Sequence, residues 1–323
     1  GPSVLDALLT PLTFVWHNER LLTARFALFP KERRDALALL SGIPAWLDAK
    51  LRESLEDSEL AQVSIACAEP PATWLRVIAD KETIAGEALA GLACHKQGLS
   101  VRLDGAAASR LLHSPAFASG CFAVQDYAAQ LPVAAIQAKP GWKCLDLCAA
   151  PGGKSCQLAE QVLPGGIVLA FDQTEGKAAK IAENVARLQL TNVSMAFGDG
   201  ASVSIPGKGQ FDCAIVDAPC SNTGVMGRRV EVKHRLSAQG FASLRELQRK
   251  LLANAAAHLK PGGTLVYSTC SLVDDENGAL VREFLNDRGG EKSGWQMRDE
   301  QLTLPQAGNH DGGYYCVLVK PKV

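Results

Sequence analysis

The chain has 323 residues, of which 47% are hydrophobic and 21% are charged, and its formal net charge is -1. These values are typical of folded domains and exclude a low-complexity, disordered chain. The near-zero charge gives no general argument for nucleic acid, so any RNA-binding surface has to be local. No apolar run approaches the roughly 18–20 residues of a membrane helix, and the N-terminus lacks a basic stretch followed by an apolar one. We therefore expect a monomer located in the cytoplasm, with no membrane partner.

The cysteines raise the question of a metal site or a disulfide framework. There are 10 of them, but no two form a CxxC pair, and the 6 histidines are scattered without HxxxH spacing. This pattern predicts no metal site and favours reduced, buried cysteines that act as small apolar residues. Two cysteines need a different explanation, which follows from their place at the ends of predicted strands.

Composition and periodicity divide the chain into three ranges. Residues 1–60 predict helices, because apolar residues recur at spacings of three and four in segments such as 36–40 and 46–55. Residues 61–125 predict a small α+β domain with strands at 74–78 and 99–103 and a helix over 82–97. The third range, 126–323, contains the longest regular pattern.

From Gly141 onward, short apolar strands alternate with amphipathic helices. Strands are predicted at 143–147, 166–171, 193–197, 211–216 and 264–268, helices at 175–189 and 241–259, and a final strand at 314–319. Strand–helix alternation with right-handed crossovers predicts an α/β fold with a doubly wound, mostly parallel sheet. In such sheets, ligands bind beyond the carboxyl ends of the strands.

The first of these strands runs into a glycine-rich loop, Asp146–Ser155. The end of this loop imitates a P-loop, but Cys148 occupies the position where the P-loop needs a glycine, and no GxGxxG pattern follows. What remains is a turn that brings backbone N–H groups to a ligand at a helix N-terminus. The predicted cofactor loop consists of Cys148, Ala149, Ala150, Pro151, Gly152, Gly153 and Lys154.

Two aspartates close the next two strands. Asp172 stands 20 residues after Gly152, where α/β cofactor sites place a carboxylate that accepts hydrogen bonds from ribose hydroxyls. Asp199 follows the third strand and is placed to approach an adenine edge. A site of this kind suits an adenosine cofactor without a pyrophosphate, which favours S-adenosyl-L-methionine over NAD.

Two thiols follow the fourth and fifth strands. The fourth strand ends in Asp217-Ala218-Pro219-Cys220, and the fifth ends in Ser268-Thr269-Cys270. Because strand carboxyl ends face the ligand site, both thiols are expected to point toward the cofactor pocket. Two cysteines there, one close to an aspartate, motivate the hypothesis of a nucleophilic thiol. The residues alone leave open which cysteine attacks.

Three motifs, Asp146–Ser155, Asp217–Gly224 and Ser268–Ser271, carry a specific family resemblance. They resemble the signature motifs of the Sun (Fmu) family of RNA 5-methylcytosine methyltransferases. The segments Pro71–Arg76, Phe122–Asp126 and Asp311–Tyr315 resemble that family as well. The resemblance implies a Rossmann-like, S-adenosylmethionine-dependent methyltransferase domain that follows a small RNA-recognition-like domain. It also implies methylation of carbon 5 of a cytosine in RNA, with 16S ribosomal RNA as the expected target and tRNA or another RNA as the alternative.

The resemblance also implies roles for individual residues. Cys270 matches the nucleophile that adds to carbon 6 of cytosine, and Cys220 matches the cysteine that assists release of the methylated RNA. Asp217 would contact the cytosine, and Lys154 would order the cofactor loop and the site. The positions that match cofactor-binding residues of the family are Cys148–Lys154, Asp172, Asp199 and Asp217.

The sequence departs from the family pattern at three places. Asn222 replaces a small residue, the run 227–234 differs from the usual basic segment, and Gly313 stands where the family often has an aromatic residue. Basic residues cluster directly after the Pro-Cys motif, although the chain as a whole is nearly neutral. We expect Arg228, Arg229 and Lys233 to contact RNA phosphates there, while the pocket reads the base.

Two other functions compete with this interpretation. A cysteine hydrolase would use Cys270 with His258 or His310. The sequence around the cysteine lacks a nucleophile elbow or a papain-like motif, and this hypothesis leaves the glycine-rich loop unexplained. A catalytically silent RNA-binding assembly factor would keep the fold alone. The presence of both cysteines and of Asp217 argues against such a factor.

Overall fold

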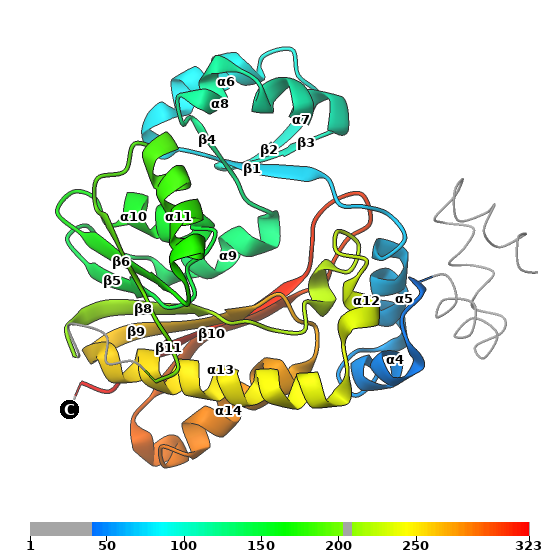
Figure 1. The fold of residues 1–323 in the computed structure, drawn as a ribbon, viewed down its shortest axis with the longest axis vertical. Coiled ribbons are helices and arrows are strands. Elements are labelled where there is room, and N and C mark those ends of the chain that lie inside the picture. Colours follow the sequence, from blue (N-terminus) through cyan, green and yellow to red (C-terminus); the bar gives the residue numbers. More distant parts are fainter. Residues whose placement is uncertain (1–40, 203–208, 323) are drawn as a thin grey trace, which may run out of the picture.

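The computed structural model describes residues 41–202 and 209–322. The helical pattern predicted for 1–60 therefore lies outside the described residues up to position 40. From there on, the chain forms the helices α4 (Ala45–Leu51) and α5 (Asp57–Ala66), then a small sheet and finally a large one (Figure 1).

The large sheet follows the alternating pattern predicted from Gly141 onward. Its strands are β5 (Lys143–Asp146), β6 (Ile167–Asp172), β7 (Val193–Phe197), β8 (Phe211–Asp217), β9 (Leu259–Thr269), β10 (Gln296–Thr303) and β11 (Gly313–Val319). Their spatial order is β10-β11-β9-β8-β5-β6-β7. Neighbours from β9 to β7 pair in parallel, whereas β11 pairs antiparallel with both β9 and β10. The predicted doubly wound, mostly parallel sheet is thereby confirmed.

Helices cover both faces of this sheet (Figure 1). One side carries α9 (Tyr127–Ile136), α10 (Gly153–Gln161) and α11 (Glu175–Arg187), and the other carries α13 (Ala238–His258) and α14 (Gly278–Asn286). The pleat of β8 explains the two cores, because Cys213 and Ile215 pack toward α9 and α10 while Ala214 and Val216 pack toward α13 and α14. The remaining short elements are η2 (Thr223–Val225), α12 (Val232–Arg235), η3 (Asp274–Glu276) and η4 (Gly290–Ser293).

The small sheet is antiparallel, with the order β2-β3-β1-β4. Its elements are β1 (Thr73–Val77), η1 (Ala79–Lys81), α6 (Glu82–Leu89), β2 (Cys94–Gln97), β3 (Ser100–Leu103), α7 (Gly105–Leu112), α8 (Pro115–Ala118) and β4 (Phe122–Val124). The helix predicted over 82–97 is wrong in its second half, because α6 ends at Leu89 and the last four residues form β2. Gly91 has φ +74°, a conformation that ends a helix, and the turn at Gly98 pairs β2 with β3.

The small sheet and the N-terminal helices both pack against the large sheet's part of the chain. Arg76 of β1 forms a buried ion pair with Glu160 of α10, at 2.5 Å between Nη1 and Oε2. Leu47 of α4 and Val63 of α5 share an apolar cluster with Met226, beside the loop that follows β8. The domain boundaries predicted after residues 60 and 125 remain predictions.

No helix in the described part of the chain is long and apolar enough to cross a membrane. Within residues 41–202 and 209–322, no group of three or more His, Cys, Asp or Glu side chains is arranged to hold a metal ion.

Candidate active site

A cavity of about 880 Å³ opens at the carboxyl ends of β5, β6, β8 and β9. The strand order reverses between β5 and β8, and this is the place where open α/β sheets bind their ligands. Most of the residues that the sequence predicted for the site line this cavity: Cys148, Ala150, Pro151, Lys154, Asp172, Asp199, Asp217, Cys220, Arg228, Arg229 and Cys270. Ala149, Gly152, Gly153 and Lys233 are not among its lining residues.

The cofactor loop takes its shape from contacts on both of its sides. The Ala150 N–H donates to Asp172 Oδ2 at 2.8 Å, and the Ala149 N–H donates to the Phe171 carbonyl at 3.0 Å. Gly152 has φ +103°, and a Cβ there would lie 3.2 Å from the Ile181 Cα of α11. Glycine is required at this position for both reasons, and the turn it makes starts α10 beside the cavity.

Asp172 and Asp199 meet the cavity in different ways. Asp172 is buried, and its Oδ1 faces the Lys177 ammonium at 2.9 Å. Asp199 is exposed, and its carboxylate accepts hydrogen bonds from the Ala201 N–H and the Ser202 hydroxyl of its own turn. The hydrogen bond from Ser202 lowers the pKa of Asp199. Both carboxylates have more acceptor lone pairs than these contacts use, so they can accept hydrogen bonds from further donors.

Asp146 lies at the end of β5, beneath the loop. It is fully buried, its Oδ2 accepts from the Ser155 hydroxyl at 2.6 Å, and its Oδ1 has no partner. Burial raises the pKa of Asp146 to about 7, although the Ser155 hydrogen bond opposes the shift. A carboxyl kept partly protonated under the loop is a feature that the sequence did not reveal.

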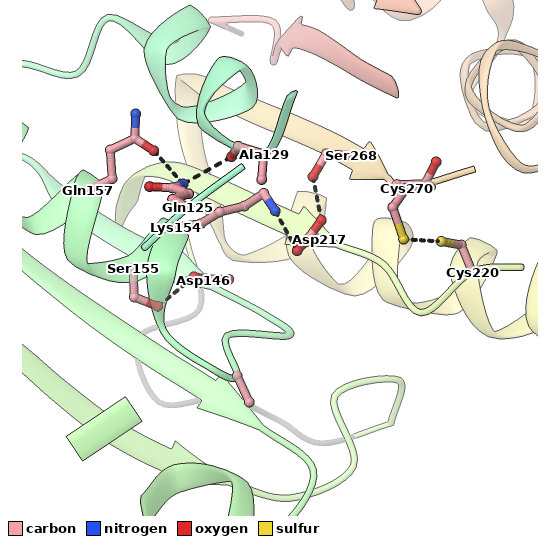
Figure 2. Close-up of polar contacts among 12 residues, drawn as sticks. Gln125, Ala129, Asp146, Lys154, Ser155, Gln157, Asp217, Cys220, Ser268 and Cys270 are labelled. Carbon is pink, nitrogen blue, oxygen red and sulfur yellow. Dashed lines mark hydrogen bonds and ion pairs between the residues drawn. The ribbon is translucent and has the colours of Figure 1, made fainter. Parts of the chain in front are cut away.

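Lys154 and Asp217 connect the cofactor loop to the thiols. Lys154 Nζ lies 2.6 Å from Asp217 Oδ2, and the Ser268 hydroxyl donates to Asp217 Oδ1 at 3.0 Å (Figure 2). Burial alone would lower the pKa of Lys154, but the charge and hydrogen bond of Asp217 outweigh it and raise the pKa. The lysine is therefore a fixed positive charge inside the cavity.

The two predicted thiols face each other across neighbouring strand ends (Figure 2). Cys220 Sγ and Cys270 Sγ lie 3.3 Å apart, and the Cys270 thiol donates to Asn222 Oδ1 at 3.1 Å. Cys220 is buried, with 6% of its surface exposed, whereas Cys270 is half-buried. The contact with Cys270, together with burial, raises the pKa of the Cys220 thiol well above its usual range. Cys220 is thus held as the neutral thiol.

A short segment after β9 holds both cysteine loops in place. The Glu276 carboxylate accepts from the Ser221 N–H at 2.9 Å and from the Ser221 hydroxyl at 2.5 Å. Asn277 accepts from the Thr269 hydroxyl at 2.6 Å and donates to the Ser271 carbonyl at 2.9 Å. Sequence reasoning missed both residues, although they follow Cys270 by only six and seven positions. Their closeness to Cys270 in the sequence predicts a role in the site only when the path of the loop between them is known.

The loop glycine after Cys220 permits an unusually close approach. The Gly224 N–H donates to the Cys270 carbonyl at 2.8 Å, and the Gly312 N–H donates to the Gly224 carbonyl at 2.7 Å. A Cβ on Gly224 would lie only 2.6 Å from the Gly312 oxygen. The two thiol loops and the loop before β11 therefore pack backbone to backbone.

The predicted RNA-contacting residues differ in availability. Arg228 donates through Nε to Asp311 at 2.8 Å and lies 3.5 Å from Asp126, so two carboxylates already neutralise its charge. Burial and the Asp311 charge raise the pKa of Asp126 to about 6. Arg229 is exposed at the rim of the cavity.

The prediction that Lys233 contacts RNA phosphates is wrong, because its side chain is buried. Its ammonium donates to the Ser41 carbonyl at 2.5 Å and lies 3.5 Å from the Cys67 carbonyl. These contacts join α12 to the N-terminal helices. The position of Lys233 makes it a structural residue that cannot reach a phosphate at the surface.

The histidines of the competing hydrolase hypothesis do not contact Cys270. His258 ends α13 just before β9 begins, so the full length of that strand separates it from the thiol. His310 is buried against Tyr127, with ring centroids 5.4 Å apart, and is not among the cavity-lining residues. Among the described residues, the Cys270 thiol has Asn222 and Cys220 as its partners and no histidine beside it.

The sheet order, the loop after β5 and the cavity at the strand reversal define a Rossmann-like methyltransferase fold. A family model described as "16S rRNA methyltransferase RsmB/F" matches residues 133–319. The chain therefore belongs to the RsmB/F family, and the resemblance to RNA methyltransferases drawn from its motifs is confirmed.

A curated relative supports the same family, and solved structures share the fold. The chain is 35% identical over 288 residues to ribosomal RNA small subunit methyltransferase B of Erwinia tasmaniensis, which covers 86% of this chain and 66% of the relative. The chain thus spans less than two thirds of that relative's length. The crystal structure of PH0851 matches with a TM-score of 0.78 at 26% identity, covering 87% of this chain and 67% of that one. The structure of NSun6 from Pyrococcus horikoshii with SFG shares the fold, with a TM-score of 0.75 at 18% identity and coverage of 87% and 99%.

Proposed function

We propose that this protein methylates carbon 5 of a cytosine in RNA with S-adenosylmethionine as the methyl donor, and that 16S ribosomal RNA is the target. The observation that carries the proposal is the cavity itself. One side of it is formed by the cofactor loop and Asp172, and the other by two thiols 3.3 Å apart beside a lysine–aspartate pair. Membership of the RsmB/F family supports methylation of ribosomal RNA, whereas carbon 5 of cytosine is proposed from the two thiols.

The residues of the cavity fit S-adenosylmethionine. Asp172 and Asp199 offer carboxylates to hydroxyl and amino groups, and Phe171, Leu247 and Leu251 offer apolar contacts to a flat base. Asp172 would hold the ribose, and the loop from Cys148 to Lys154 would hold the amino-acid part. When bound, S-adenosylmethionine supplies an electrophilic methyl group to carbon 5 of the cytosine.

The thiols account for how carbon 5 becomes reactive. After the Cys270 S–H has given up its proton to water, the thiolate would add to carbon 6, forming a C–S bond and shifting the electron pair of the ring double bond toward carbon 5. Carbon 5 would then take the methyl group, with S-adenosylhomocysteine as the leaving group. Water acting as a base would remove the carbon 5 proton, and the electrons of that C–H bond re-form the double bond as the C–S bond breaks, which returns the thiolate. The greater exposure of Cys270 and the neutral state of Cys220 favour Cys270 as the nucleophile.

The other polar groups stabilise charge during this sequence. Lys154, held by Asp217, places a positive charge where the pyrimidine ring gains electron density. Asp217 would contact the base that Cys270 attacks, and the fact that both residues line the same cavity supports this role. The neutral Cys220 thiol lies next to Cys270 Sγ and would assist its departure from carbon 6.

RNA has to present an unstacked cytosine to this cavity. Arg229 lies at the rim and is exposed, so it is the best-placed residue to contact a phosphate of the bound strand. Arg228 would contribute mainly by holding the rim together through Asp126 and Asp311.

The decisive experiment offers the full chain methyl-labelled S-adenosylmethionine with unmodified 16S ribosomal RNA, tRNA and DNA in parallel. We expect label to enter 16S ribosomal RNA, and bisulfite sequencing to locate it at carbon 5 of a cytosine. Label in tRNA alone would show that tRNA, not 16S ribosomal RNA, is the target, and the cytosine-5 reaction would still stand. Absence of transfer to every nucleic acid would leave the silent RNA-binding factor as the better explanation.

A further inference from the structure

The Asn222 side chain joins the loops that carry the two thiols. Its Nδ2 donates to the Cys220 carbonyl at 2.8 Å, and its Oδ1 accepts from the Cys270 thiol at 3.1 Å. Asn222 also lines the cavity. It contacts the sulfur of Cys270 but only the backbone of Cys220, so its effect on the two cysteines is unequal.

The orientation of the Asn222 amide follows from its neighbours. Exchanging the oxygen and nitrogen would place Oδ1 against the Cys220 carbonyl oxygen, and two acceptors at that distance repel each other. Oδ1 therefore faces Cys270, whose single S–H is donated to it. In the contact between the two sulfurs, Cys220 then has to be the hydrogen-bond donor. The hydrogen bonds therefore run from Cys220 to Cys270 and from Cys270 to Asn222.

The backbone holds this amide in place. Asn222 has φ +61°, a left-handed conformation that asparagine and glycine tolerate better than other residues. Immediately after it, the Thr223 hydroxyl accepts from the Leu272 N–H at 2.8 Å and the Gly224 N–H donates to Cys270. The backbone that carries the amide is therefore fixed to the loop of Cys270 by two hydrogen bonds.

We infer that Asn222 is a positioning residue, which holds the Cys270 side chain in the rotamer from which its sulfur attacks carbon 6. The inference rests on the proposed function, since it assigns the nucleophile to Cys270. The amide oxygen is too weak a base to remove the thiol proton, so its contribution is to restrict the sulfur's position. A misplaced reacting atom slows a reaction even when its intrinsic reactivity is unchanged.

The test substitutes glycine, which removes the amide and keeps the left-handed backbone conformation. RNA for the test is 16S ribosomal RNA transcribed with 5-fluorocytidine, in which fluorine replaces the proton that has to leave carbon 5, so that the adduct persists. We expect Asn222→Gly to slow the formation of this adduct by about 10-fold. The dissociation constant for S-adenosylmethionine, measured by calorimetry, should stay within about 2-fold, because the amide makes no contact with the cofactor loop.

A second measurement separates position from reactivity. Iodoacetamide is small enough to reach the sulfur in any rotamer, and peptide mass spectrometry reports its reaction at each cysteine. In Asn222→Gly, alkylation of Cys270 relative to the exposed Cys94 should stay equal or rise, because the sulfur loses its contact with the amide and gains open space beside it. The matched control is Gln189→Gly, which has the same positive φ of 61° away from the cavity and should behave like the unsubstituted protein in both assays.

Slower adduct formation with undiminished alkylation supports the inference. Unchanged adduct formation in an active protein, or alkylation that falls in parallel, overturns it and leaves the proposed function standing. If the unsubstituted protein neither traps the fluorinated RNA nor transfers methyl groups, the proposed function is rejected together with the inference that rests on it.

Discussion

The two sides of the cavity use different chemistry to hold their functional groups. At the ends of β5 and β6, carboxylates and an ammonium dominate: Asp146, Lys154 and Asp172 all lie within the loop's hydrogen-bonding network. At the ends of β8 and β9, two thiols and an amide face the cavity beside the single carboxylate of Asp217, and Glu276, which orders the thiol loops, is buried beneath.

This difference matches two different tasks. A polar, hydrogen-bonded surface suits the binding of a polar cofactor, since carboxylate oxygens accept several donors. A neutral, buried surface suits a thiol that has to become a thiolate only when its target base is present. Lys154 and Asp217 form an ion pair that connects the two sides, because the lysine follows β5 and the aspartate ends β8. Each of the following substitutions tests one side or the connection.

The largest effect is expected from removing the nucleophile. Cys270→Ala should lower the rate of methyl transfer by about 10⁴-fold and abolish covalent trapping of RNA, because the remaining thiol of the pair, Cys220, is buried and held neutral. Binding of S-adenosylmethionine, measured by calorimetry, should be retained, since the cofactor side is untouched. Cys94→Ala, at an exposed cysteine of the small sheet, is the control and should stay active.

Removing the second thiol should impair release of the methylated RNA and leave formation of the covalent adduct intact. Cys220→Ala should lower multiple-turnover activity by about 10³-fold while the protein–RNA adduct accumulates, because addition proceeds but release is impaired. A slower band on a denaturing gel with unmodified RNA is the readout. Accumulation of this band in Cys270→Ala instead would reverse the two roles.

The connection between the two sides is tested at Lys154. Lys154→Met removes the positive charge beside the reacting ring and leaves Asp217 without its partner, so adduct formation should slow by about 10²-fold. Lys260→Met is a matched control, because Lys260 pairs with Asp212 at 2.7 Å at the opposite end of the sheet. Equal losses in the two variants would indicate a general effect of breaking a lysine–aspartate pair.

The smallest effect concerns stability on the cofactor side. The pKa of Asp146 is raised from its ordinary value of 3.8 to about 7, so the native state loses stability as pH rises from about 4 to 7 and levels off above that. Asp146→Asn carries no charge at any pH and keeps an acceptor for Ser155. Between pH 5 and pH 8, the wild type should therefore lose about 3 kcal/mol of unfolding free energy relative to the variant. Urea unfolding at both pH values measures this difference, and an equal difference at both would contradict it.

Sequence reasoning recovered the elements whose signal is local. The strand ends that carry Asp172, Asp217 and Cys270 follow apolar runs bounded by polar turns, so their place at one edge of a parallel sheet could be predicted. The helix over 82–97 failed because its second half contains no strong apolar pattern, and β2 forms only by pairing with β3. The role of Glu276 was hidden for a similar reason, since its partner Ser221 is 55 residues away in the chain.

The sequence by itself determined the fold class, the loop after the first strand of the large sheet and the identity of the two thiols. These follow from hydrophobic periodicity and from short motifs, which act over a few residues. Only the tertiary structure decided which groups are free to act. It buried Lys233 against two backbone carbonyls, paired Arg228 with two carboxylates, and placed Asn222 between the Cys270 thiol and the Cys220 carbonyl. Burial and pairing depend on segments distant in the chain, and these two properties determine whether a charged or nucleophilic side chain remains available for chemistry.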